Sequence, residues 1–164
     1  MARKNKSANA TAAVAVVATP AKKMTAQDVV EHVVGSLMRR YGQAMTEFRK
    51  WNERLSNAEM GCDVAYAVEW SDAAFTCAAK AKVTQIVILG TSIMVAKGMT
   101  GEEMLAALHK TVSGEVLRGA MYPSHSTSGA SNTMAGAQLA AYASVLETIQ
   151  QTADFADVQI GGAA

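Results

Sequence analysis

The chain has 164 residues and a mass of 17.2 kDa, the size of one domain. Half of its residues are hydrophobic, with 32 alanines and 10 methionines, whereas aromatic residues make up 5% and proline occurs twice. This composition argues against a loop-rich β-sandwich and a disordered chain, and alanine and methionine favour helices. We expect a mainly α protein, a bundle of about four helices with one long amphipathic helix.

The net charge of +1 conceals a gradient along the chain. Residues 1–54 hold 10 Lys and Arg against 4 acids, whereas residues 55–164 hold 5 against 10. A basic front end of charge +6 on a body of charge −5 indicates an anionic partner, either nucleic acid or a membrane surface. The alternative is a solubilising tail that binds nothing.

Residues 1–23 are expected to form a flexible basic arm. The segment resembles a secretory signal in outline, but alanine dominates its apolar stretch. The two cysteines, Cys62 and Cys77, match neither a disulfide framework nor a zinc motif, which favours a reduced, cytoplasmic protein. The apolar stretch 83–96 is shorter than the roughly 20 residues of a spanning helix, so we expect a buried core segment and no membrane partner.

The first predicted helix covers residues 25–59. Its start, T-A-Q-D, resembles a capping box. Apolar residues then recur every seven positions along two seams, one of Val34, Tyr41, Phe48 and Leu55 and the other of Val30, Leu37, Ala44, Trp51 and Ala58. Such a helix is about 50 Å long, which exceeds what a small monomer's core can cover, so the seams predict a homo-oligomer.

The segment between residues 62 and 90 is ambiguous. Val64, Tyr66, Val68 and Trp70 alternate as in a strand, whereas the following alanine-rich part favours a helix over 62–81. Residues 84–90 fit either a strand or the centre of a buried helix. One or two short strands within 64–90 therefore remain an alternative.

The last third of the chain predicts two more helices. One begins after Thr100, with Glu103 at the capping-box position, and ends near Gly119. A loop rich in Ser, Thr and Gly follows at 122–133, and a final helix spans about 133–151. We expect a single helical domain over 24–152 and a flexible tail over 153–164.

The main candidate site is a run in which basic and aromatic residues alternate. Proteins that bind single strands use cationic grooves for phosphates and aromatic faces for bases. The aromatic residues Tyr41, Phe48 and Trp51 fall on the heptad seams, which favours a core role for them. The cations lie off the seams and should be exposed: Arg39, Arg40, Arg49, Lys50 and Arg54.

Two further segments are candidates for nucleic-acid contacts. The arm supplies Arg3, Lys4, Lys6, Lys22 and Lys23. The loop at 122–133 offers hydroxyl and N–H groups before a helix start, including Ser124, as a phosphate seat. Tyr122 and His125 are placed to stack on a base. The alternative is an ordinary solvated loop.

An enzymatic role has little support in the sequence. His32, His109 and His125 have no metal-ligand spacing, and neither a dinucleotide-binding nor a P-loop glycine motif occurs. We therefore expect no catalytic residues, no metal and no cofactor.

The basic–aromatic run 39–54 and the arm 1–23 resemble the small phage-encoded, single-stranded-DNA-binding RNA-polymerase cofactors of N4-like phages. The resemblance implies an accessory role in transcription or replication, with an RNA polymerase or a replication protein as partner. We expect a non-catalytic nucleic-acid-binding protein that prefers single-stranded DNA, because no duplex-reading motif occurs. The alternative is a structural or scaffolding assembly protein, associated with a virion.

Overall fold

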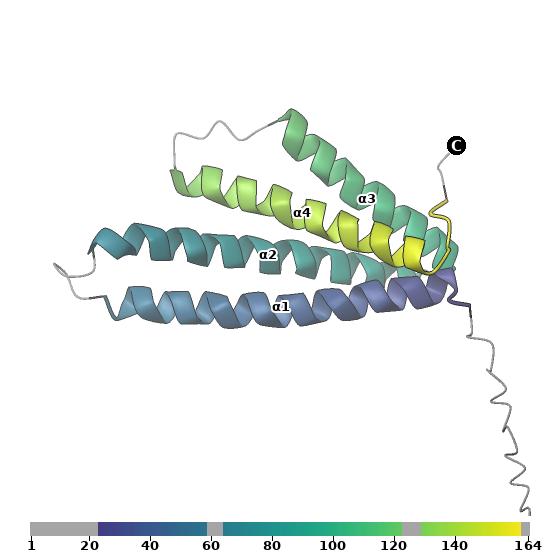
Figure 1. Cartoon of the computed structure of the whole chain (residues 1–164), viewed down its shortest axis with the longest axis horizontal. Helices are drawn as coiled ribbons and strands as arrows, with labels where there is room; N and C mark the ends of the chain where they lie inside the picture. Colours follow the sequence, from purple (N-terminus) through teal and green to yellow (C-terminus); the bar gives the residue numbers. More distant parts are fainter. Residues whose placement is uncertain (1–22, 59–63, 123–128, 162–164) are drawn as a thin grey trace, which may run out of the picture.

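The computed structural model describes residues 23–58, 64–122 and 129–161. Within these ranges the chain forms four helices and no strand: α1 (Ala26–Ser56), α2 (Val64–Ala96), α3 (Gly101–Met121) and α4 (Gly129–Phe155). Figure 1 shows α1 and α2 as a long pair, with α4 beside α2 and α3 diverging from α4. The prediction of a mainly helical bundle of about four helices is confirmed for the described residues.

The alternative of short strands within 64–90 is wrong, because α2 is one continuous helix. Tyr66 and Trp70, two of the alternating residues, are four positions apart and so lie on one side of the helix. Their rings stack with centroids 6.0 Å apart. Val83 and Val87 are buried in the bundle core, and this packing outweighs the weak helix propensity of β-branched residues. The buried Thr91 hydroxyl donates to the Val87 carbonyl, so it adds no unpaired polar group.

The two heptad seams of α1 differ in burial. Val30, Leu37 and Ala44 of the second seam are buried, whereas Tyr41 and Phe48 of the first are only half-buried. α1 packs chiefly against α2, which has 33 residues to the 31 of α1. The length of α1 therefore does not by itself require a second subunit, and the homo-oligomer stays a prediction.

Both predicted capping boxes are present. Thr25 and Asp28 exchange hydrogen bonds at the start of α1, and Thr100 and Glu103 do so at the start of α3. The Thr100 N–H donates to a Glu103 carboxylate oxygen over 2.8 Å. Hydrogen bonds from the Thr100 backbone and then its hydroxyl lower the pKa of Glu103, which keeps the carboxylate charged beside the helix N-terminus.

The predicted flexible tail is wrong for its first residues. α4 continues to Phe155, Ala153 and Ala156 are buried, and Val158 and Ile160 pack against the core. A Schellman motif follows the last helical residue: Asp157 has a positive φ of 54°, and the Val158 N–H donates to the Ala153 carbonyl. The sequence analysis missed this end because it contains no glycine.

The starts of α1 and α3 meet backbone to backbone at one end of the bundle, which we call the closed end. A Cβ atom on Gly101 would fall 2.7 Å from Gln27 Cα and 3.0 Å from the Ala26 carbonyl carbon. The atoms it would meet belong to the backbone of α1, so no flexible side chain is there to move aside. Only glycine therefore fits at the start of α3.

Gly101 and Gly114 of α3 should respond oppositely to substitution by alanine. Gly101→Ala should lower the free energy of unfolding, because the added methyl group meets the α1 backbone. Gly114→Ala is the matched control: its Cβ meets nothing within 4 Å, so it should raise stability by about 0.5–1 kcal/mol. Urea denaturation followed by circular dichroism measures both. Equal effects of the two variants would contradict the close contact.

Candidate functional site

The five predicted cations of α1 do not form one face. Arg39, Lys50 and Arg54 are exposed on one flank, since residues 11 apart lie on the same side of a helix after about three turns. Arg49 is exposed too, but it precedes Lys50 by one position and so points about 100° away. The predicted patch is therefore split across two sides of the helix.

The expectation that Arg40 is free and exposed is wrong. Arg40 is half-buried, and its Nη1 donates to the Ser144 hydroxyl of α4 at 3.2 Å. It lines a groove of about 360 Å³ between α1, α2 and α4 that also contains Cys77 and Lys80. Burial raises the pKa of the Cys77 thiol, which keeps it protonated. Arg40 thus links α1 to α4.

Aromatic and cationic side chains gather where α1 ends and α2 begins. We call this group the hairpin tip: Lys50, Trp51, Arg54, Tyr66 and Trp70. The Arg54 guanidinium carbon lies 4.8 Å from the Trp51 ring centroid, and Lys50 Nζ lies 5.5 Å from it. Lys50, Arg54 and Trp70 line one cleft of about 380 Å³. The side chain of Tyr66, stacked on Trp70, is 55% exposed.

The charges around the hairpin tip balance. The cations Lys50 and Arg54 are accompanied by the acids Glu47 and Glu53 of the same helix, and Glu53 lines the same cleft. Lys50 Nζ lies 3.4 Å from a Glu47 oxygen, and both side chains are half exposed. The positive field of Lys50 and Arg54 is therefore weakened by these two neighbouring acids.

Several predicted site residues lie outside the described residues: Arg3, Lys4, Lys6, Lys22, Ser124 and His125. Lys23 is described, and its Nζ forms an exposed ion pair with Asp157 at 2.9 Å. Lys23 lies at the start of α1, whereas the hairpin tip lies at the other end of this helix, about 45 Å away along its axis. The arm's last residue and the hairpin tip are thus not one local site.

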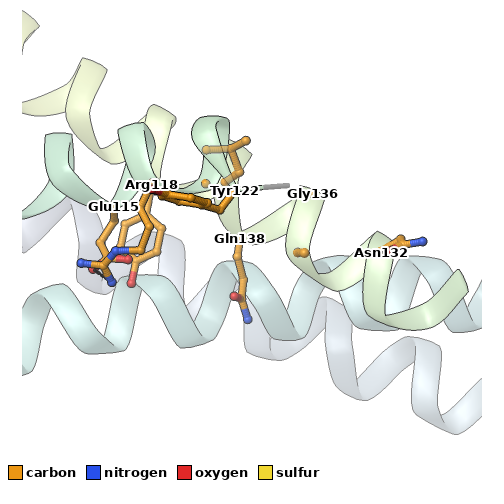
Figure 2. A pocket seen from close by; sticks show the side chains of 10 residues that line it. Glu115, Arg118, Tyr122, Asn132, Gly136 and Gln138 are labelled. Carbon is orange, nitrogen blue, oxygen red and sulfur yellow. Dashed lines mark ion pairs between the residues drawn. The ribbon is translucent and has the colours of Figure 1, made fainter. Parts of the chain in front are cut away.

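Tyr122 lines a pocket of about 400 Å³ between α3 and α4. Its side chain is among the most exposed apolar groups, with 73% of the residue accessible. Figure 2 shows Glu115 and Arg118 together at one end of the pocket, Asn132 at the other, and Tyr122 and Gln138 between them. Arg118 Nη1 lies 2.9 Å from a Glu115 carboxylate oxygen. Burial, reinforced by the Glu115 charge, raises the pKa of Tyr142.

The outer side of α2 carries exposed apolar residues. Ile86, Leu89 and Ile93 are 46–56% exposed and follow the helical spacing of three and four residues. The expectation that 83–96 is wholly buried is thus wrong on this side. Within the described chain, one span, Tyr66–Ala96, is long and apolar enough to cross a membrane, and 33% of its most apolar window is buried in the bundle.

The α2 part of the hairpin tip and most of the polar lining of the α3–α4 pocket were not predicted from the sequence. Tyr66 and Trp70 are four residues apart, which predicts a contact once the segment is treated as a helix. Glu115 and Arg118 are three residues apart, a spacing that likewise predicts a contact within a helix. No three His, Cys, Asp or Glu side chains of the described ranges are grouped as metal ligands.

Comparison with known proteins finds no match to this chain, either among protein-family models, among curated proteins or among solved structures.

Proposed function

We propose that this protein is a non-catalytic accessory protein that binds single-stranded nucleic acid, preferably DNA, through the hairpin tip. One observation supports this proposal above the others. Lys50 and Arg54 lie over the ring of Trp51, and the same two cations line one cleft with Trp70. A role beside a polymerase or replication protein in the cytoplasm, as in a phage-infected cell, accords with this activity.

The hairpin tip offers the two chemistries that a single strand needs. Aromatic faces such as that of Tyr66 stack on bases without regard to sequence, and cations contact the phosphates between them. The Lys50–Glu47 pair is a surface ion pair, worth about 0–1 kcal/mol, so a phosphate can replace the carboxylate at small cost. Because the local charge is balanced, we expect stacking to supply much of the affinity.

Removing cations of the hairpin tip should reduce the salt dependence of binding. Lys50→Ala and Arg54→Ala should each flatten the slope of log K against log salt by about 0.7, the value for one phosphate of a single strand. Titrating the protein with a 20-nucleotide single-stranded oligodeoxynucleotide at several salt concentrations, followed by tryptophan fluorescence, measures this slope. Tyr66→Ala should weaken binding by about 1–3 kcal/mol and leave the slope unchanged.

Arg49→Ala is the matched control, since it removes the same charge from the other flank of α1 and should change the slope by less than half as much. The proposal fails if no binding occurs at low salt, or if Arg49→Ala has the same effect as Arg54→Ala.

A second candidate function, self-assembly as a structural or scaffolding protein, is favoured by the outer side of α2. Exposed large apolar residues arranged along one helix side often mark a protein interface. Because α1 is already covered by α2, a second copy of the chain would pack on Ile86, Leu89 and Ile93 rather than on the α1 seams. The two functions are compatible.

Leu89→Glu should convert an assembled protein into a monomer, because it places a charge at the centre of that side. Leu117→Glu is the control, since Leu117 is 60% exposed on α3 and Leu89 54% exposed on α2. Sedimentation velocity at micromolar concentration distinguishes the species. A well-folded wild-type monomer at that concentration would exclude self-assembly through α2.

A further inference from the structure

The α3–α4 pocket has the form of a small-molecule site. Its volume of about 400 Å³ falls in the usual range of ligand pockets, roughly 300–1,000 Å³. Gly119, Ala135, Gly136 and Leu139 form apolar walls, and a few polar groups converge on the space. A Cβ on Gly119 would lie 2.9 Å from Leu139 Cδ1, so the helices touch there.

The charges of the pocket select against a simple anion. Glu115 and Arg118 form an ion pair at 2.9 Å, and the Glu115 side chain is 30% exposed. A phosphate at Arg118 would meet the neighbouring carboxylate. A neutral planar ring suits the pocket better, because its N–H groups can donate to Glu115 while its carbonyl oxygen accepts from Arg118.

We propose that this pocket binds a single unstacked nucleobase, guanine in preference to the others, with its ring against Tyr122. Guanine presents two adjacent N–H donors on its Watson–Crick edge beside the O6 acceptor. A carboxylate accepts two parallel hydrogen bonds, and arginine donates to O6. Gln138 carries both a donor and an acceptor for the remaining positions. This inference rests on the proposed function and adds base preference to it.

The position of the pocket fits a strand that also contacts the hairpin tip. Figure 1 shows the start of α4 toward the end of the bundle that holds the hairpin tip, whereas α3 ends about midway along α1 and α2. The Thr133 hydroxyl donates to Asp72 at 3.3 Å, which fixes the start of α4 beside α2. One base of a bound strand can therefore occupy the pocket while a more distant part of the same strand contacts the hairpin tip.

Free nucleosides test the pocket independently of strand binding. Guanosine should shift the NMR signals of the pocket residues saturably, with a dissociation constant of about 1 mM or below, and bind at least tenfold more tightly than adenosine, cytidine or thymidine. Glu115→Gln should abolish this preference, since the amide accepts fewer hydrogen bonds than the carboxylate, and Tyr122→Ala should weaken the binding of all four.

Gly136→Leu fills the pocket without altering its polar groups. The variant should fold, because a Cβ there meets nothing within 4 Å and leucine favours helices more than glycine. It should lose guanosine binding while oligonucleotide binding at the hairpin tip keeps its salt slope. A control, Gly114→Leu, lies on α3 outside the pocket and should bind guanosine normally.

The possible results separate the two proposals. Absence of nucleoside binding, equal binding of all four nucleosides, or unchanged binding by Gly136→Leu would overturn the guanine pocket. In those cases, salt-dependent strand binding that is sensitive to Lys50 and Arg54 would leave the proposed function standing. Guanosine binding without any strand binding would instead retain the pocket and reject the strand-binding function.

Discussion

The contact between the starts of α1 and α3 constrains the whole bundle. Gly101 allows the α3 backbone to touch Gln27 of α1. Two helix N-termini with parallel dipoles therefore lie together, an arrangement that is unfavourable without nearby negative charge. Asp28 and Glu103, the acidic members of the two capping boxes, supply that charge. With the helices fixed here, α3 diverges from α4 toward the other end (Figure 1), and the pocket at Tyr122 occupies the resulting space.

The helix starts could be predicted because the hydrogen bonds that form them join residues close together in the sequence. The capping boxes at Thr25 and Thr100 predicted two helix starts to within a residue. The strand alternative for α2 failed because period-two alternation over a few residues also occurs within a helix. The end of α4 was missed because aspartate, rather than glycine, adopts the left-handed conformation there.

The candidate site was less predictable, since it depends on which helices become neighbours. The heptad pattern identified Lys50 and Arg54 as exposed, but it could not show that Arg40 would bond to Ser144. Nor could it show that Trp70 of α2 would line one cleft with Lys50 and Arg54. Pairs close in sequence were detectable, whereas contacts between α1 and α4 required the fold. The proposed binding at the hairpin tip would therefore depend more on aromatic surface and less on net charge than the α1 sequence indicates.

Because the start of α3 is held against the backbone of α1, a small rotation about that contact would displace the far end of α3 the most. Its 21 residues extend about 30 Å, so a rotation of about 5° around Gly101 would move Met121 by about 2–3 Å. Small adjustments of packing at the closed end are thereby amplified at Tyr122, where the pocket lies. A ligand between α3 and α4 would restrain that motion, and mobility of the helix would in turn be coupled to occupancy of the pocket.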